Sequence, residues 1–189
     1  MTTTDSGTLT GIPGYVAGTW SIDPVHSEVG FTVRHMMVSK VRGRFRTFSG
    51  EIVTGENPLE SAVTAEIDLS SIDTGQEQRD AHIRSADFFE VETYPTMTYR
   101  STGVRQDGDV YILHGELTLK GVTKDVELAL ELNGFGPDAY GGTRAGFTAI
   151  AEINRRDFGV NFTAVMETGG AVVSDKVTIQ LEIEAVLQP

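Results

Sequence analysis

Alternation of apolar and polar residues runs through most of this chain and favours strands over helices. In residues 61–69, SAVTAEIDL, the side chains of Val63, Ala65 and Ile67 fall on one face, and polar side chains fall on the other. Residues 176–187, KVTIQLEIEAVL, repeat the pattern over a longer span. A period of two residues is typical of a strand with one face in water. The pattern predicts about eight to ten strands, with further examples at 28–35, 43–54, 96–106, 109–120 and 144–153.

Antiparallel strands of this kind indicate an all-β domain that is either a sandwich or a closed barrel. Closure would remove the exposed strand edges that invite aggregation. Small residues, among them Ala65, Gly115 and Ala149, share the inward parity of larger apolar neighbours. Because an eight-stranded barrel is either filled by side chains or holds one small ligand, small inward residues favour a cavity. Large side chains from elsewhere could still fill the space, so both alternatives remain open.

One charged segment interrupts the strands and predicts a helix at about residues 75–85. Thr74 followed by Glu77 matches a capping box, and Asp80 and Arg84 have the spacing of an ion pair on the solvated helix face. Asp80 and His82 are two residues apart and point to different faces, which does not suit an acid–base pair. We therefore expect this helix to pack against or close the barrel rather than to carry chemistry.

The length of 189 residues suits one domain, which we expect to span residues 19–188 after a flexible lead-in at 1–18. The chain has no cysteine, which excludes disulfides and thiolate chemistry. The first residues lack the cationic and apolar regions of a signal peptide, and no apolar run has the length of a membrane span, so we expect a cytoplasmic protein. A net charge of −12 disfavours nucleic acid as a partner.

A basic segment stands out against this acidic background. Arg42, Arg44 and Arg46 share one strand face. The simple interpretation is a solvated outer face. The alternative is a transient contact with an anionic membrane surface or a phosphate head group.

The search for catalytic motifs finds no nucleophile elbow, phosphate loop or dinucleotide fingerprint. The four histidines lack metal-ligand spacing, so we expect no metal and no cofactor. His35 shares its strand face with Phe31 and Val33, and that face is predicted to point inward. Its ring could bond a backbone carbonyl in the core, or it could anchor the polar end of a ligand in an apolar pocket.

Taken together, the segments of this chain resemble the YceI-like, polyisoprenoid-binding, lipocalin-like family. The resemblance extends from about Trp20 to Leu187. It is carried by GTWSIDPVHSEVGFTVRH at 18–35, GRFRTFSGEI at 43–52, DLSSIDTGQEQRDAHIRSADFFEVETYPTMTYRS at 68–101, GELTLKGVTKDVEL at 115–128 and INRRDFGV at 153–160.

The resemblance implies a lipocalin-like, extended eight-stranded antiparallel barrel that holds a long apolar chain, such as a polyisoprenoid, an isoprenoid quinone or a fatty-acyl lipid. It also implies homodimers, roles in lipid storage, transport or stress response, and a binding protein rather than an enzyme. From parity and pattern we expect His35 near the polar end and an apolar wall built by Phe31, Val33, Met36, Phe45, Phe48, Ile67, Phe88, Phe89, Met97, Tyr99, Phe147 and Phe162.

Two alternatives belong to other classes of function. The first is an enzyme that acts on a hydrophobic substrate through His35 and a nearby carboxylate or hydroxyl. The second is an interaction module whose barrel has a filled core. A hollow or a solid interior separates the second alternative from a binder.

Overall fold

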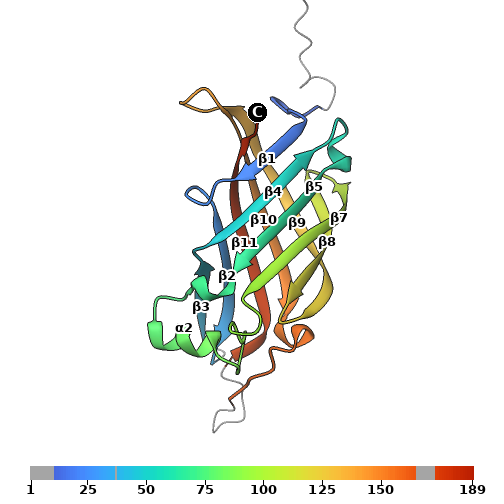
Figure 1. Cartoon of the computed structure of the whole chain (residues 1–189). Coiled ribbons are helices and arrows are strands. Elements are labelled where there is room, and N and C mark those ends of the chain that lie inside the picture. The colour runs from blue at the N-terminus through green and yellow to red at the C-terminus, as the bar shows by residue number, and fades with distance from the viewer. Residues whose placement is uncertain (1–10, 37, 165–172) are drawn as a thin grey trace, which may run out of the picture.

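The computed structural model describes residues 11–36, 38–164 and 173–189, and these form an elongated antiparallel β-barrel (Figure 1). One α-helix, α2 (Glu77–Arg84), lies at the lower end in that view. Short 3₁₀ turns occur at Pro58–Glu60, Leu69–Ser71 and Arg155–Phe158. The strands are β1 (Gly18–Ile22), β2 (Glu28–His35), β3 (Ser39–Phe45), β4 (Phe48–Thr54), β5 (Ala62–Asp68), β6 (Ile72–Asp73), β7 (Thr96–Asp107), β8 (Val110–Leu119), β9 (Val122–Pro137), β10 (Thr143–Asn154) and β11 (Val173–Leu187).

The long last strand closes the barrel. One edge of β11 pairs with β10, and its other edge pairs with β1 near Leu187 and with β2 around Ile179. β1 and β2 are therefore two halves of one barrel strand. β3 and β4 are likewise two halves of the next strand, because β2 pairs with β3 and β1 pairs with β4. The closed ring of eight antiparallel strands confirms the predicted barrel and excludes the sandwich.

The second barrel strand is held unevenly along its outer edge. Its upper half, β4, pairs with β5 from Phe48 to Val53. Its lower half, β3, pairs with the short strand β6 only at Arg44 and Phe45. The barrel wall is therefore a continuous backbone ladder at the β1 end and a shorter ladder at the α2 end.

The predicted parity is confirmed along the strands. Val126 and Leu128 on β9 are buried, as are Ala145, Ala149 and Ala151 on β10, whereas their neighbours are more exposed. Burial of these apolar side chains supplies the main driving force for folding, at about 25 cal/mol per Å² removed from water. None of the helices in the described part of the chain is long and apolar enough to cross a bilayer.

Aromatic side chains pack at the β1 end of the barrel. Trp20 is 1% exposed, and its Nε1 donates a hydrogen bond of 2.9 Å to Thr54 Oγ1. The ring of Phe135 contacts Tyr15, Trp20 and Phe147 with centroid distances of 5.3, 5.7 and 6.0 Å. Tyr15 is buried and donates to the Gly55 carbonyl, so the packed body includes residues before the expected boundary at 19.

The helix α2 lies where it was predicted, but its charged residues are arranged differently. Thr74 is not the cap: Gln76 occupies that position and makes no side-chain capping bond. Asp80 is 4% exposed and accepts hydrogen bonds from the amide and hydroxyl of Thr74. Arg84 pairs with Glu77 instead. The predicted Asp80–Arg84 pair on a solvated face is therefore wrong, because the turn before the helix folds back over the Asp80 side.

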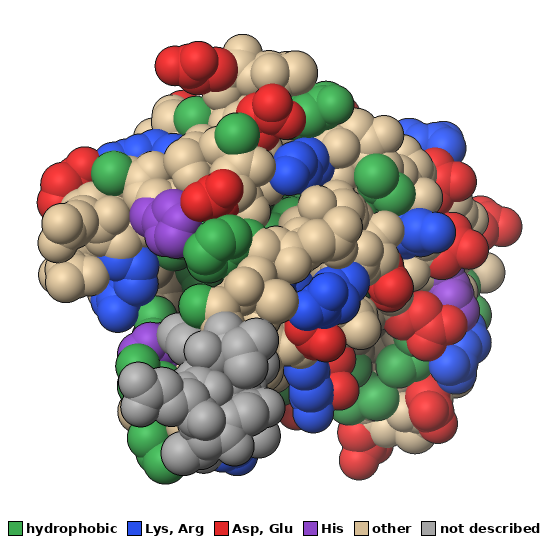
Figure 2. Space-filling model, turned by 90° about the horizontal axis from the view of Figure 1, so that it is seen from below, with side chains coloured by type: hydrophobic (Ala, Val, Ile, Leu, Met, Phe, Trp, Pro, Cys, Tyr) green, Lys and Arg blue, Asp and Glu red, His purple; other side chains and the backbone are tan. Residues whose placement is uncertain are grey.

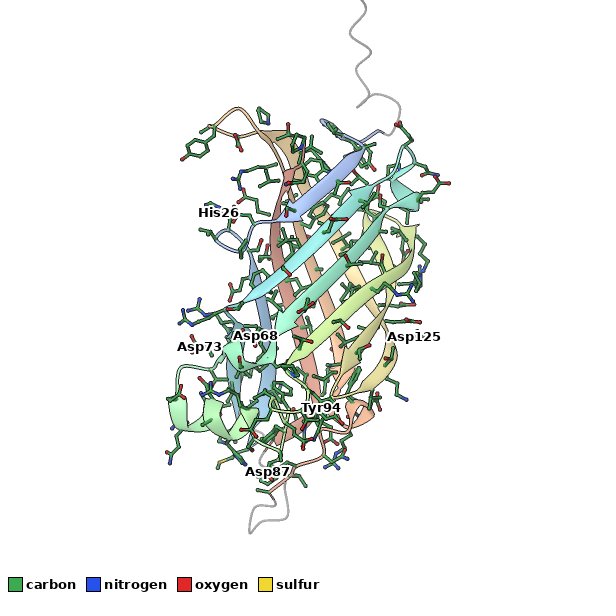
Figure 3. The ribbon with its side chains drawn as sticks, viewed as in Figure 1. His26, Asp68, Asp73, Asp87, Tyr94 and Asp125 are labelled. Carbon is green, nitrogen blue, oxygen red and sulfur yellow. The ribbon has the colours of Figure 1, made fainter. Side chains whose placement is uncertain are left out.

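A cluster of charges joins the loop after β1 to the β9–β10 turn. Arg144 contacts the carboxylates of Asp23, Asp138 and Glu184 at 2.8, 3.1 and 3.4 Å. His26, labelled in Figure 3, lies 2.7 Å from Asp23. Hydrogen bonds from Arg144 and then His26 hold the pKa of Asp23 well below its ordinary value of 3.8. Within the described ranges, Asp23, His26 and Glu184 are the one group with converging ligand atoms, and Arg144 already neutralises its carboxylates.

Replacement of Arg144 by Met should make the protein less stable at neutral pH and less sensitive to acid. Because the folded-state pKa of Asp23 is depressed, its contribution is present above about pH 4 and is lost as the pH falls through the lower folded-state value. Urea unfolding at neutral and acidic pH measures both effects. Arg100→Met, which breaks an exposed pair with Glu116, is the control. An acid dependence that is identical in wild type and R144M would contradict this account.

Candidate functional site

The barrel interior contains two chambers. The β1-end chamber has a volume of about 180 Å³ and the α2-end chamber about 630 Å³. Met97 and Ile179 contribute to the walls of both. An apolar cavity of about 150 Å³ is large enough for benzene. The α2-end chamber alone is roughly four times that size. The interior is therefore hollow rather than filled by side chains.

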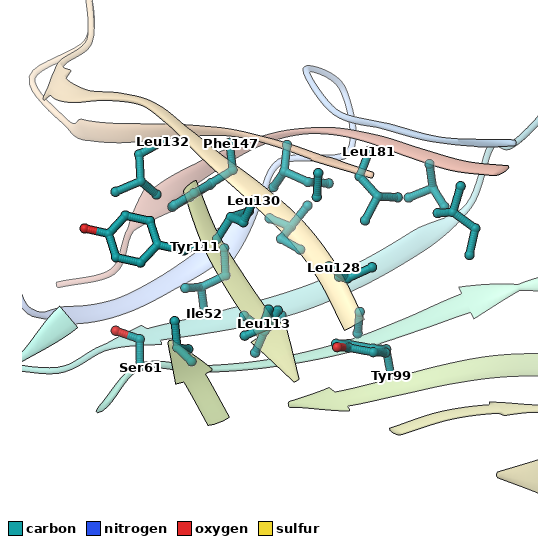
Figure 4. Close-up of a pocket in the computed structure, with 18 of the residues that line it drawn as sticks. Ile52, Ser61, Tyr99, Tyr111, Leu113, Leu128, Leu130, Leu132, Phe147 and Leu181 are labelled. Carbon is teal, nitrogen blue, oxygen red and sulfur yellow. The ribbon is translucent and has the colours of Figure 1, made fainter. Parts of the chain in front are cut away.

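The wall of the β1-end chamber is almost entirely apolar. Figure 4 shows Leu113, Leu128, Leu130 and Phe147 pointing into it from several strands. The few polar side chains are hydroxyls, and none of the described residues that line this space is charged. The hydroxyl of Tyr99 donates to the Val126 carbonyl at 3.0 Å, and burial raises its pKa. A chamber of this composition suits a hydrocarbon chain and offers nothing to a charged group.

Glycines make room for the aromatic walls of both chambers. A Cβ at Gly115 would lie 2.4 Å from the Tyr99 ring, and one at Gly43 would lie 2.3 Å from the Phe31 ring. Gly43 lies opposite Phe31 in the β2–β3 ladder, and Gly115 lies opposite Ser101, two residues along β7 from Tyr99, so both rings lie against bare backbone. Phe31, Phe45 and Phe89 then form a tilted series with centroid distances of 5.7 and 6.2 Å.

Polar side chains gather at the α2 end. The α2-end chamber is lined by the apolar residues Phe31, Val33 and Phe45, but its rim carries donors. These donors come from β2, α2, the turn before it and the Arg155 turn, and no Asp or Glu is among the described lining residues. Seen from this end, Figure 2 shows hydrophobic atoms between charged side chains, with histidines beside them. The polar lining residues are Arg34, His35, Thr74, Gln76, Gln78, Arg79, His82 and Arg155.

Arg155 is buried and holds the chain around the rim. Its guanidinium donates to the carbonyls of Val160 and Phe162 at 2.8 and 2.7 Å, and its Nε donates to the Ser174 carbonyl at 3.0 Å. Burial lowers its pKa, while Asp175 at 3.4 Å opposes that shift. Arg155 therefore ties the segment after β10 to the start of β11.

An aromatic group joins α2 to the barrel at this end. The ring of His82 packs edge-on against Phe88 and Phe162, with centroid distances of 5.1 and 4.9 Å. Phe88 and Phe162 also contact each other at 5.1 Å. His82 Nε2 lies 2.8 Å from the carboxylate of Asp87, which Figure 3 labels at the same end. These contacts hold the helix against the chamber, which agrees with the expectation that the helix packs against or closes the barrel.

Most of the predicted wall residues line a chamber. Phe48, Ile67, Tyr99 and Phe147 line the β1-end chamber, and Met97 lines both. The α2-end chamber is lined by Phe31, Val33, His35, Phe45, Phe88, Phe89 and Phe162. Contact of any of these residues with a ligand stays a prediction.

Met36 was placed wrongly. It lines neither chamber, is 42% exposed and has a positive φ of 54°. It belongs to the turn between β2 and β3, where the chain leaves the inward face.

His35 lies on the inward face, as its strand parity predicted. Its side chain lines the α2-end chamber, and its ring makes no hydrogen bond with the described part of the chain. A carbonyl-bonded core histidine is therefore not observed among the described residues, and the alternative role of His35 as an anchor for a ligand stays a prediction.

Arg79, His82 and Arg155 were missed as lining residues. Arg79 and His82 are three residues apart on α2, a spacing that places two side chains on one helix face and could have identified them. Arg155 carries no comparable signal, because its partners are backbone carbonyls.

Two of the three arginines in the basic segment of β3 and the residue after it have an ion-pair partner. Arg44 and Arg46 both contact Asp73, at 3.7 and 2.5 Å. Only Arg42 of the three is without a described ion-pair partner. The outer face that these arginines share therefore carries a carboxylate beside two of them, because the chain returns at β6. The membrane or phosphate contact expected of the three arginines stays a prediction.

Residues 20–185 match the YceI-like domain family. The chain belongs to this family. It is 39% identical over 176 residues to Protein YceI of Escherichia coli O157:H7, an alignment that covers 92% of this chain and 89% of the relative. It is 44% identical over 140 residues to UPF0312 protein plu2095 of Photorhabdus laumondii subsp. laumondii, covering 74% and 72% of the two chains.

Solved structures share the YceI-like fold. The YceI protein of Campylobacter jejuni superposes with a TM-score of 0.71 at 29% identity, covering 88% of this chain and 96% of that one. BcnA of Burkholderia cenocepacia gives 0.76 at 24% identity over 86% and 98%. A polyisoprenoid binding domain from Saccharophagus degradans gives 0.63 at 20% identity over 92% and 100%. The last two likenesses are of fold alone.

The contacts of Asp80 predict an effect on stability. Asp80→Ala should lower the free energy of unfolding by about 1–3 kcal/mol, because it leaves the amide and hydroxyl of Thr74 without their acceptor. Asp80→Asn keeps an acceptor oxygen at the same place and should lose less than half as much. Urea unfolding of both variants measures the difference. Equal losses would mean that the bonds to Thr74 do not carry the effect.

Proposed function

We propose that this protein binds one long-chain apolar lipid, a polyisoprenoid or an isoprenoid quinone, inside the barrel. The observation that carries the proposal is the order of the interior: an uncharged apolar chamber at the β1 end, then a larger chamber whose polar side chains gather at the α2 end. An elongated amphipathic ligand has the same order of chemistry. The family membership of the chain supports the same class of ligand.

The energy of such binding comes from removing the chain from water. Burial contributes about 0.8 kcal/mol per CH₂ group, or roughly 4 kcal/mol for a five-carbon isoprene unit. Several units therefore supply enough free energy for tight binding after the losses of translational and conformational freedom.

The polar rim supports one orientation of the ligand. The tail lies towards Phe147 and Leu130, and the oxygen-bearing head lies towards His35, Arg79 and His82. These side chains can donate hydrogen bonds to carbonyl, carboxylate or phosphate oxygens. The reverse orientation would bury polar oxygens in a chamber that offers a few hydroxyls and no cationic donor among its described lining residues, which costs free energy.

We propose a binding protein rather than an enzyme. No Asp or Glu is among the described residues that line either chamber, so His35 has no lining carboxylate to orient it as a general base. His82 does meet Asp87, but Asp87 lies on the outer side of the rim and is half exposed. The role that follows is storage, transport or sequestration of the lipid, including during stress.

Homodimer assembly is a further proposal that rests on the family resemblance. Light scattering of the purified protein measures the assembly directly. A monomeric mass at all accessible concentrations would overturn it.

Organic extraction and native mass spectrometry of the protein as purified test the main proposal. The expected result is a bound lipid of discrete mass, or uptake of an added prenyl quinone at one molecule per chain. Absence of any bound lipid, together with failure to take up prenyl quinones of several lengths, would overturn the proposal.

Chain-length preference should change when the β1-end chamber is filled. Ala65 lines this chamber, so Ala65→Leu should shorten the space for the tail. The affinity for the longest accepted prenyl quinone should fall about tenfold, while that for a shorter one changes little. Ala62→Leu is the matched control, because Ala62 lies on the same strand and is exposed. Competition between quinones, read by mass spectrometry, measures the preference. An equal loss for short and long chains would show that the tail lies elsewhere.

A further inference from the structure

We propose that the tip of the β2–β3 hairpin docks onto a membrane that contains anionic lipid. The tip is defined here as Arg34–Met36 and Val38–Arg42. It combines exposed apolar side chains, free cations and direct contact with the rim of the α2-end chamber. Each of these observations is independent of the others.

The apolar part of the tip faces solvent. Val38 is 86% exposed and Met36 is 42% exposed. Met36 also adopts a positive φ of 54°, a conformation that glycine or asparagine adopts more readily. At 86% exposure the side chain of Val38 gains almost no burial from the fold of the monomer, and Met36 keeps a large part of its surface in water. Insertion into the acyl region of a bilayer would bury both.

The cations of the tip repel each other. Arg34 and Lys40 are directly opposite in the β2–β3 ladder, and Arg42 follows on the same outer face as Lys40. None of the three has an ion-pair partner in the described part of the chain. Like charges directly opposite each other destabilise a strand pair. Anionic head groups would relieve this repulsion, at about 1 kcal/mol, or fivefold in affinity, for each basic residue.

Among the described residues, no carboxylate forms an ion pair with these cations. Residues 29–50 contain no Asp or Glu. Asp175, near the start of β11, is already shared by Arg155 and Arg156. Asp73 is occupied by Arg44 and Arg46. The tip is therefore a local positive surface on a chain of net charge −12, and screening over about 8 Å at physiological salt lets the local charge dominate at contact.

The tip of the hairpin lies beside the α2-end chamber, so docking would bring this chamber close to the membrane. Arg34, His35 and Val41 line the α2-end chamber, so the same hairpin forms both the docking surface and part of the rim. A bilayer in contact with Val38 would face the end of the barrel where the lipid head is proposed to lie. That consequence rests on the proposed function, whereas docking itself does not.

The apolar side chains favour a bilayer over another polyanion. Nucleic acid would neutralise Lys40 and Arg42 but would leave Val38 in water. The strongly acidic remainder of the chain would also oppose a long polyanion. Duplex DNA is therefore the competing partner that the experiment must exclude.

Vesicle co-sedimentation of the full chain tests the proposal. The probes are phosphatidylcholine vesicles with and without about 30% phosphatidylglycerol, a level that gives an anionic surface. Wild type should bind the anionic vesicles and lose binding as salt is raised. Lys40→Gln with Arg42→Gln should weaken binding about 25-fold, or fivefold for each cation. Val38→Ser should also weaken it, and by a factor that salt does not change.

The matched control is Arg100→Gln with Arg105→Gln, which removes the same charge from exposed positions on β7. This variant should bind within about twofold of wild type, because its charges lie on β7, which pairs with β5 and β8 and not with either strand of the docking hairpin. Equal binding to neutral and anionic vesicles would overturn the proposal. So would unchanged binding by K40Q/R42Q, or binding to a DNA duplex without binding to vesicles.

The cavity ligand is read separately by native mass spectrometry. Loss of vesicle binding in K40Q/R42Q with the lipid still bound would support docking as a distinct property. Vesicle binding by a wild-type protein that takes up no lipid would support docking while removing the proposed function.

Discussion

The two-sided pairing of β11 is the constraint on which the rest of the molecule depends. Its fifteen residues pair with β10 along one edge and with both β1 and β2 along the other. This pairing joins the last strands to the first and closes the sheet. Closure turns one face of every strand into an interior. The alternation of Ile179, Leu181 and Ile183 then supplies an apolar wall, and small residues on β10 keep that wall from meeting in the middle.

The sequence was most informative where local pattern and tertiary position agree. Parity along β9 and β11 predicts which side chains face inward, because a strand leaves a side chain only two directions. Strand bounds such as Glu28–His35 follow for the same reason. The family resemblance then distinguishes a barrel from a sandwich, which alternation alone does not.

The failures have a common physical origin in contacts between segments. Asp80 has the composition of a solvated helix face, but it is buried by a turn that the helix pattern does not describe. Arg155 donates hydrogen bonds to backbone carbonyls. Every residue has a carbonyl, so the sequence does not mark these partners. Arg44 and Arg46 find Asp73 only after the chain has returned through β6. A sequence pattern predicts the direction in which a side chain points from its own helix or strand. These contacts depend instead on the position of a second segment in the folded chain.

The short ladder beside β3 has a consequence for how the barrel can exchange its contents. Over most of β3, the outer edge has no backbone partner among the described residues; pairing with β6 is limited to Arg44 and Phe45. Side chains from α2 and the segment after it, including Phe89, cover this part of the wall. A lateral opening at this seam would part side chains and a few backbone bonds, while the long ladders of β7 to β11 stay intact. For the lipid binding proposed above, the scaffold could then stay rigid during loading and release, because the shortest ladder of the wall lies next to the polar rim.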